Sequence, residues 1–482
     1  SRRIASGGNN PVFSPGGDSV AYYKGNTAGA VLANGKTELL VVKTTGGASP
    51  RIQGGFSGLC CAIWTPDGKH LLFLGNRDSK LPLEKSLDWW VVPLDGGPAV
   101  KTGALDITRS RGLRGIVSEA PMAVLPGAWN PSGSGVIFSA RSGDSTNLWQ
   151  VDISPVTFKA AGEARRLTSG TAFESQPSAA PRPGGGRRVV FASTTENSDV
   201  WSLPIAAEQA RVLGNPQRLT DNAAADFSPD ISVDGRKLIF ISMRTGSEQI
   251  WVKDLVTGEE AAVTTSTTEK YSPRLSPDAS SLTYSQSGTW PIYLVRLAGG
   301  AEELLSEAVG LATSWMPDGG AIFFHDVPGS VSFLDLASRQ RTRLLAKPDS
   351  RLVATTISPD GRWLSFSAAS GDSSQIFLAP YRGPAFIEEK DWIEVTDGRS
   401  WDIGSIWSLG SGVIYFSSDK DGYSCIWAQP LDPETRRPSG PPIDIYHEHS
   451  ASRTVCPWAI GRNRLIFTMI ERTGDIWMAD YR

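Results

Sequence analysis

The feature that most constrains this chain is a short pattern that repeats at intervals of roughly 40–50 residues, the length of a four-stranded repeat. In one copy, an apolar strand leads into the turn Asp234-Gly235, a second apolar strand follows at residues 238–241, and a third carries Ile250-Trp251. Asp can bond its own backbone in a tight turn, and Gly tolerates the positive φ that a two-strand hairpin demands. Each copy therefore predicts antiparallel strands joined by tight turns.

The turn of this repeat recurs along the whole chain, and only its last two copies lack the Pro or Asp that marks the others. Such self-similarity is typical of a tandem array in which each repeat is one small sheet. The copies are Pro15-Gly16-Gly17, Pro66-Asp67-Gly68, Pro131-Ser132-Gly133, Pro183-Gly184-Gly185, Asp234-Gly235, Pro277-Asp278, Pro317-Asp318-Gly319, Pro359-Asp360-Gly361, Leu409-Gly410-Ser411 and Ile460-Gly461-Arg462.

The third strand of most copies carries an aliphatic–aromatic pair. A large aromatic side chain buries about 150–250 Å², so a ring that recurs at one position of every sheet is suited to fill the space between neighbouring sheets. We interpret these pairs as packing residues and not as ligand cages. They are Trp89-Trp90, Leu148-Trp149, Val200-Trp201, Ile250-Trp251, Ile292-Tyr293, Ile376-Phe377, Ile426-Trp427 and Ile476-Trp477.

Together these repeats predict an all-β fold, a β-propeller of about ten four-stranded blades that forms a single domain over residues 1–482. The last copy supplies three strands, and Arg2-Arg3-Ile4-Ala5 resembles the outer strands at residues 165–168 and 217–220. We therefore expect residues 1–6 to pair with the final blade and to close the ring, which removes two exposed sheet edges.

The blade number leaves an alternative open. Ten blades exceed the four to eight that are typical of propellers, so two smaller propellers are the other reading of the same repeats. The longest break in the periodicity lies at residues 104–127, which is either a boundary or an inserted loop on one face. Residues 109–114 of this segment are basic.

The overall charge of the chain does not indicate which kind of partner it binds. The 47 basic and 50 acidic residues are spread evenly and leave a net charge of −3, so we expect no nucleic-acid ligand. No apolar run approaches the roughly 20 residues that a membrane helix needs. A chain that starts directly with a strand-like segment is compatible with a membrane tether in an upstream segment.

Metal-ligating residues are few. The four cysteines have no zinc-type spacing, and we interpret them as buried apolar residues; a disulfide between Cys425 and Cys456 stays open, whereas adjacent Cys60 and Cys61 are expected on opposite faces of a strand. His447-Glu448-His449 is a compact cluster, since residues i and i+2 of a strand share a face. No third ligand can be named from the sequence, so we expect a solvated outer strand or loop, no metal site and no cofactor.

Catalytic motifs are also missing. A peptidase of the prolyl-oligopeptidase type needs the elbow Gly-x-Ser-x-Gly on an α/β-hydrolase sheet, and neither residues 404–406 nor residues 410–412 have this spacing. We therefore predict that the chain is not an enzyme. A propeller glycosidase, or the propeller half of such a peptidase without its catalytic domain, is the alternative.

Binding is expected at loops on one face, because rigid blades position variable loops around a central funnel. An arginine cluster near exposed aromatic residues suits an acidic peptide, a glycan or a protein surface. The predicted contact residues are Arg109, Arg111, Arg114, Phe173, Glu174, Trp401 and Asp402.

Several of these motifs resemble a known family. The turn at residues 358–361, the loop at residues 416–422 and the following Ile426-Trp427 are similar to the repeats of the TolB-like, or WD-like, bacterial β-propeller family. The end of the chain, residues 474–478, resembles the C-terminal sensor propellers of bacterial membrane serine/threonine kinases and winged-helix regulators.

The resemblance implies a noncatalytic binding propeller with a protein, peptide or glycan ligand at one face of the ring. It implies either the extracytoplasmic recognition domain of a signalling protein or a TolB-like interaction module, in the periplasm or another extracytoplasmic place. A cytoplasmic location stays open, because this inference rests on fold analogy.

Overall fold

In the computed structural model, strands dominate the described residues, which confirms the all-β class.

Pro183 and Gly184 of the fourth predicted turn, and residues 117–122 of the predicted insertion, lie outside the described residues. None of the helices in the described part of the chain has the length and apolar character that a membrane crossing needs. The structure describes residues 2–481 apart from 7, 25–36, 49, 51, 53–54, 78–82, 117–122, 144, 183–184, 288, 308–309, 327–328, 349, 371–372 and 451.

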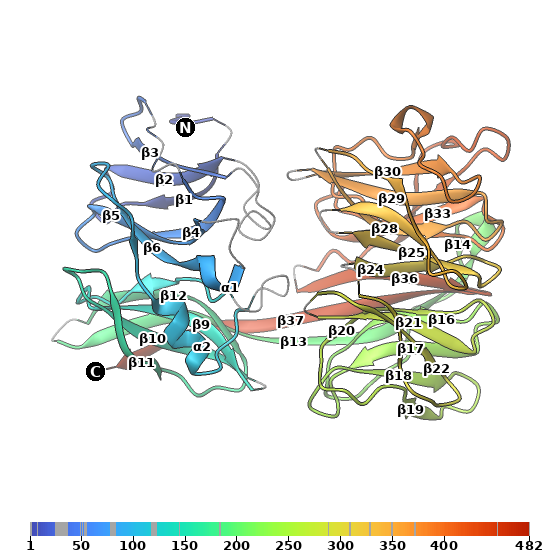
Figure 1. Ribbon diagram of the computed structural model, residues 1–482, viewed down its shortest axis with the longest axis horizontal. Coiled ribbons are helices and arrows are strands. Elements are labelled where there is room, and N and C mark those ends of the chain that lie inside the picture. Colours follow the sequence, from blue (N-terminus) through green and yellow to red (C-terminus); the bar gives the residue numbers. More distant parts are fainter. Residues whose placement is uncertain are drawn as a thin grey trace. The chain divides into compact units, whose positions relative to one another are not determined.

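The chain divides into two compact units (Figure 1). The first unit comprises Ser1–Thr195 and Thr473–Arg482, and the second comprises Glu196–Arg472. Two long strands, β13 (Arg187–Ala206) and β37 (Arg464–Tyr481), each contribute one part to the first unit and the other part to the second.

The strands of the first unit form four groups, β1–β3, β4–β7, β8–β11, and β12 with β13 and β37, and a parallel pair between β10 and β12 joins the last two groups. Their first strands contact one another in the order β1, β4, β8 and β12. The part of β37 in this unit pairs with β13, which pairs with β12. The other elements are β1 (Asn9–Phe13), β2 (Ser19–Lys24), β3 (Glu38–Lys43), β4 (Gly58–Trp64), β5 (His70–Asn76), α1 (Leu83–Ser86), β6 (Leu87–Pro93), β7 (Val100–Lys101), α2 (Ala104–Ser110), β8 (Ala128–Trp129), β9 (Gly135–Ser142), β10 (Ser145–Ile153), β11 (Ala160–Arg166) and β12 (Phe173–Pro181).

The second unit contains five four-stranded sheets and a sixth that joins β36 and β37 to β13 and β15. Its other elements are η1 (Ala207–Gln209), β14 (Arg211–Val212), β15 (Gln217–Arg218), β16 (Asp226–Ile231), β17 (Lys237–Ser242), β18 (Gln249–Asp254), β19 (Glu260–Ala262), β20 (Lys270–Leu275), β21 (Ser281–Gln286), β22 (Ile292–Arg296), β23 (Glu303–Ser306), β24 (Gly310–Trp315), β25 (Ala321–Asp326), β26 (Ser330–Asp335), β27 (Arg341–Leu345), β28 (Arg351–Ile357), β29 (Trp363–Ser370), β30 (Ser373–Pro380), η2 (Glu389–Asp391), β31 (Ile393–Glu394), β32 (Ile403–Trp407), β33 (Val413–Ser418), β34 (Cys425–Pro430), β35 (Ile443–Tyr446) and β36 (Arg453–Gly461).

The six sheets of the second unit follow one another in a closed circle. Their first strands contact in the order β16, β20, β24, β28, β32 and β36, and β36 returns to β16. On one side of the sixth sheet, Ile466 packs with Val200 and Phe240, and on the other side Phe467 packs with Tyr415. A single ring of about ten blades over residues 1–482 is therefore not what the structure shows. The chain divides into two compact units, and two smaller propellers stay a prediction.

Ring closure also differs from the expectation. Residues 2–6 form no strand, and Ile4 and Ala5 pack against Val20 and Tyr22 of the first sheet. The second unit is instead closed by β13, which pairs with β37 from the far end of the chain. The strand that covers the edge of the last sheet thus comes from residues 187–206 and not from residues 1–6.

The tight turns follow the predicted chemistry. The Ser232 hydroxyl donates to Asp234 Oδ1 at 2.5 Å, and the same oxygen accepts the Arg236 amide at 3.0 Å. Gly235 has φ 74°, which Gly adopts without strain.

The predicted packing pairs are buried in most sheets. Trp89, Leu148, Ile250, Ile376 and Ile426 have almost no exposed surface. The last pair is an exception, because Ile476 and Trp477 are 74% and 56% exposed.

One cysteine prediction was wrong. Cys60 Sγ and Cys61 Sγ lie 2.6 Å apart and do not point to opposite faces. The register of β4 and β5 shifts between Cys60 and Ile63, and Cys61 has φ 62°. This β-bulge breaks the alternation of side chains along the strand. Cys425 and Cys456 are both free thiols.

Candidate functional site

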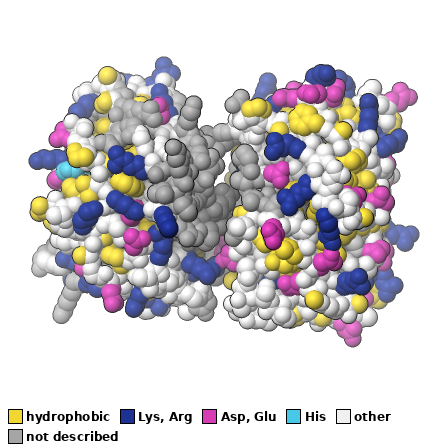
Figure 2. All heavy atoms as spheres, in the orientation of Figure 1, with side chains coloured by type: hydrophobic (Ala, Val, Ile, Leu, Met, Phe, Trp, Pro, Cys, Tyr) yellow, Lys and Arg dark blue, Asp and Glu magenta, His cyan; other side chains and the backbone are white. Residues whose placement is uncertain are grey.

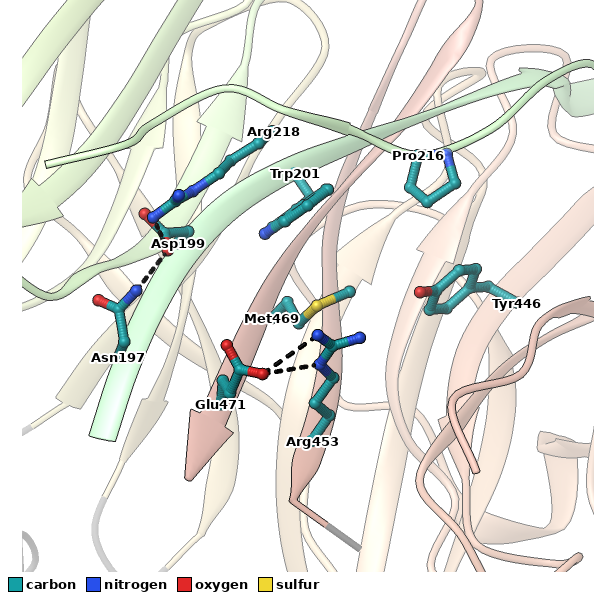
Figure 3. Close-up of a pocket in the computed structure, with 9 residues that line it drawn as sticks. All are labelled: Asn197, Asp199, Trp201, Pro216, Arg218, Tyr446, Arg453, Met469 and Glu471. Atoms are coloured by element: carbon teal, nitrogen blue, oxygen red, sulfur yellow. Dashed lines mark hydrogen bonds and ion pairs between the residues drawn. The ribbon is translucent and has the colours of Figure 1, made fainter. Parts of the chain in front are cut away.

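A pocket of about 300 Å³ lies in the second unit, between the sixth sheet and the neighbouring sheet that ends in β35 (Figure 3). Strands from both ends of the unit form its walls: β13 and β15 come from the start, and β35, β36 and β37 come from the end. The lining residues are Asn197, Asp199, Trp201, Pro216, Arg218, Tyr446, Arg453, Met469 and Glu471.

One wall of the pocket carries an ion pair on β13 and β15. Arg218 Nη2 donates to Asp199 Oδ2 at 2.5 Å, and Asn197 Nδ2 donates to the same oxygen at 2.8 Å. Thr220 Oγ1 donates to the other oxygen, Oδ1, at 3.3 Å. Asp199 is buried, whereas 38% of the Arg218 side chain is exposed. The guanidinium is therefore held in place at the edge of the pocket.

The opposite wall carries a second ion pair. Arg453 and Glu471 are directly opposite each other on β36 and β37, and Arg453 Nε donates to Glu471 Oε1 at 3.1 Å. This carboxylate raises the pKa of the Arg453 guanidinium. Arg453 Nη1 also lies 3.6 Å from Glu448 Oε2, which accepts a hydrogen bond from Tyr446. Figure 3 shows both ion pairs facing the same space.

Apolar side chains fill the part of the wall between these ion pairs. Met469 is buried, and Trp201 and Tyr446 are half-buried and pack against the core of the second unit. The Tyr446 ring lies 5.4 Å from the ring of Phe467. The pocket thus offers apolar surface between two fixed, charge-balanced pairs, an arrangement suited to binding an amphipathic segment.

The predicted arginine cluster lies in the first unit and is engaged by the protein itself. Arg109 Nη1 donates to Asp106 at 3.1 Å within α2, and Arg111 lies 3.8 Å from Glu163. The backbone of Arg114 pairs with Arg141. Helix α2 lies in the segment predicted as an insertion, and its Leu105 belongs to the core of the first unit.

Of the predicted contact residues, the two aromatic ones are partly exposed and the two acidic ones are buried. Phe173 and Trp401 are both 38% exposed, whereas Glu174 and Asp402 are buried. Glu174 accepts hydrogen bonds from Asn147 and Thr168. Burial raises the pKa of the Asp402 carboxyl, against the opposing effect of its hydrogen bonds.

The structure does not bring the seven predicted residues together in one unit. Five lie in the first unit, two lie in the second, and none lines the pocket. Sequence reasoning missed the pocket because its walls are more than 200 residues apart in the chain. One signal was present: the outer-strand segment at residues 217–220, which includes Arg218.

The predicted histidine pair has partners that the sequence did not reveal. His447 Nδ1 and His449 Nε2 both lie 3.0 Å from Asp421 Oδ2, and the two nitrogens are 3.1 Å apart. With Cys425 Sγ, these donor atoms all lie within 4.8 Å of one another. Asp421 and Cys425 come from the hairpin between β33 and β34, which explains why a search for neighbours in the sequence did not find them.

The charge on the drawn face of the second unit resembles the even distribution of charge along the chain. On the face of the second unit in Figure 2, basic and acidic side chains are interspersed. This distribution agrees with the net charge of −3.

Comparison with known proteins relates this fold to a described family. Residues 213–330 match the family model of the TolB beta propeller domain. The chain is 25% identical over 229 residues to the Tol-Pal system protein TolB of Francisella tularensis subsp. tularensis, which covers 45% of this chain and 50% of that protein. The chain thus spans about half the length of this curated relative.

Two solved structures match parts of the chain at low sequence identity. A candidate TolB from Agrobacterium tumefaciens has 17% sequence identity and a TM-score of 0.45, over 58% of this chain and 99% of that chain. TolB from Acinetobacter baumannii has 13% identity and a TM-score of 0.41, over 71% of this chain and 81% of that chain. Residues 213–330 are therefore similar to the TolB beta propeller domain.

Proposed function

We propose that this chain is a noncatalytic binding propeller that recognises a protein or peptide segment at the pocket of the second unit. The observation that best supports this proposal is the combination of Trp201, Tyr446 and Met469 with two ion-paired arginines. Trp, Tyr, Met and Arg are the residue types enriched in the buried centres of protein interfaces. A ligand side chain can bury apolar surface against the rings while its polar groups bond to the charged pairs.

The pocket favours recognition over hydrolysis. Its nine lining residues include no serine, cysteine or histidine that would serve as nucleophile or base. The carboxylates of Asp199 and Glu471 are each engaged by an arginine. These lining residues therefore have the groups that binding requires.

The proposal extends to an extracytoplasmic sensor or interaction module of a bacterium, with the TolB-like match as its support. The sequence-predicted residues form a second proposed contact set. Among them, Arg111, Phe173 and Trp401 have side chains that are partly exposed and able to reach a partner. Glu174 and Asp402 would act by holding the loops that carry the aromatic residues.

Selection from a random-peptide phage library on the immobilised full chain tests the pocket. We expect enriched peptides with an aromatic or aliphatic residue, whose affinity is then measured by calorimetry. Trp201→Ala should weaken binding by about 30-fold, because truncating a central aromatic residue of an interface costs about 2 kcal/mol or more. Arg453→Ala should also weaken peptide binding. It should change the free energy of unfolding by less than about 1 kcal/mol, because the ion pair that it removes is an exposed cross-strand pair.

Trp477→Ala is the matched control, since Trp477 is an exposed tryptophan in the first unit. Peptides that bind this variant and the two pocket variants equally well would contradict the proposal, as would a library without enrichment. Turnover in a panel of glycan substrates would overturn the noncatalytic assignment.

A further inference from the structure

Four side chains with metal-ligating atoms meet at one end of the β32–β35 sheet. Asp421 lies in the hairpin between β33 and β34, and Cys425 is the first residue of β34. His447 and His449 follow β35 and project to the same side. No two of the four donor atoms are more than 4.8 Å apart.

Three of these donors form a nearly equilateral triangle. Asp421 Oδ2, His447 Nδ1 and His449 Nε2 are separated by 3.0, 3.0 and 3.1 Å. Zinc bonds of about 2.0–2.1 Å in a tetrahedral site place such donors about 3.3 Å apart. A zinc ion would therefore fit above this triangle with small adjustments of the side chains.

Hydrogen bonds alone do not account for the triangle. A neutral imidazole carries one N–H, and a carboxylate carries none. The two histidines can therefore supply at most two protons to the three edges, and one edge would leave two polar atoms in contact without a proton between them. A cation that accepts all three lone pairs satisfies every edge.

The fourth donor selects the kind of metal. Cys425 has no exposed surface, and its sulfur completes a set of one sulfur, two nitrogens and one oxygen. Mg²⁺ and Ca²⁺ prefer oxygen ligands alone, whereas Zn²⁺ binds thiolate, imidazole and carboxylate in four-coordinate sites. A sulfur donor lies about 3.6 Å from its neighbours in such a site, so the farthest pair would close by about 1 Å.

The surroundings support the ligands. Asp444 Oδ2 lies 3.9 Å from His447 Nε2, the nitrogen that does not face the other donors. This distance is too long for a hydrogen bond, but the carboxylate lies beside the nitrogen that an outer-shell carboxylate commonly orients in metal sites. Trp427 packs against His447 and Tyr423 stacks on His449, both at 4.8 Å between ring centroids.

The site is accessible from solvent. The side chains of His447, His449 and Asp421 are 28%, 52% and 24% exposed. A metal ion in solvent can therefore reach the two histidines and the aspartate, whereas Cys425 is the buried ligand of the set.

We propose that Asp421, Cys425, His447 and His449 form a zinc site, which the sequence did not predict. Four protein ligands make a closed, structural site, and here the metal ties the β33–β34 hairpin to the segment after β35. Glu448 lies between the two histidines and faces Arg453 of the pocket. Zinc would thus order one wall of the pocket, but the site does not depend on the proposed binding function.

Titration of the chelator-treated full chain with Zn²⁺, in competition with a chromophoric chelator, tests the site. We expect one ion per chain with a submicromolar Kd. Asp421→Asn and His449→Ala should each weaken binding by about 100-fold or more, because even the loss of an outer-shell partner costs about 10–100-fold. Co²⁺ should give a sulfur-to-metal charge-transfer band, which Cys425→Ser should abolish.

The matched controls are His70→Ala and Cys456→Ser. His70 Nδ1 also lies near a carboxylate, 3.6 Å from Asp67, and Cys456 is also a free thiol, so both variants should bind zinc like the unchanged chain. Circular dichroism of each variant verifies its fold, and Asp421→Asn preserves the size of the side chain. The proposal is overturned if the unchanged chain does not saturate at one ion, or if the ligand variants bind like the controls. Peptide binding by the metal-free chain is measured separately, so either proposal can fail alone.

Discussion

His325 on β25 is a histidine whose surroundings determine its charge. Its Nε2 accepts a hydrogen bond from the Thr355 amide at 3.2 Å, which requires the unprotonated nitrogen. Burial lowers the pKa of His325 to about 3, and the positive charge of Arg351 acts in the same direction. The folded second unit therefore holds this side chain neutral.

This environment predicts an acid-sensitive stability. The unfolded chain binds a proton at His325 below pH about 6.5, whereas the folded chain does not until pH about 3. The contribution is fully present above pH 6.5 and is lost as the pH falls toward 3, at about 1.4 kcal/mol per pH unit. Denaturant unfolding of the unchanged chain and of His325→Gln at a series of pH values measures this slope. The variant should have the shallower slope, and equal slopes would contradict the assignment.

The sequence predicted features that depend on neighbouring residues, and it missed features that depend on contacts with distant strands. The Asp234-Gly235 turn was predictable because its hydrogen bonds stay within five residues. The contact between Cys60 and Cys61 was not, because it depends on a bulge against a neighbouring strand. Of the proposed zinc ligands, His447 and His449 were visible as a cluster because they are two residues apart in the sequence. Asp421 was not, because the hairpin brings it to them.

The third strand of each sheet shows how the same element can have two environments. Trp149 in β10 is 5% exposed and belongs to the core of the first unit, whereas Trp477 in β37 is 56% exposed. The pairing of β37 with β36 ends at Glu471, so residues 473–481 pair with β13 and carry no strand on their other edge among the described residues. The sequence pattern predicts the strand, but its burial depends on neighbours.

Matched alanine variants test this difference between elements. Trp149→Ala should destabilise the chain by about 3–5 kcal/mol, because it removes a large side chain from a packed core. Trp477→Ala should change the free energy of unfolding by no more than about 0.5 kcal/mol, as for other surface substitutions. Denaturant unfolding of the two variants gives both values. A large loss in Trp477→Ala would mean that another part of the protein covers this strand.

At the scale of the whole molecule, the repeats predicted sheets but not their grouping. Most copies of the repeat have a similar turn and a similar aromatic pair, so the local pattern alone does not say which sheets share a ring. The grouping follows from the contact between β36 and β16 and from the pairing of β13 with β37, which joins residues more than 250 apart. The pocket lies beside this pairing, so the same long-range contact that closes the ring also builds the candidate site.

The two groups of sheets have separate cores, which predicts that damage to one core stays local. Ile466 on β37 is fully buried with Val200 and Phe240 in the second unit, and Leu72 on β5 is fully buried with Trp89 in the first. Replacing either by alanine costs about 2–5 kcal/mol. In hydrogen–deuterium exchange, Ile466→Ala should raise exchange in residues 196–206 and in β16–β18 while β4–β6 stay protected, and Leu72→Ala should do the reverse. If both variants raise exchange equally in all of these strands, the two units unfold together. That result would contradict the prediction that each core is stabilised independently.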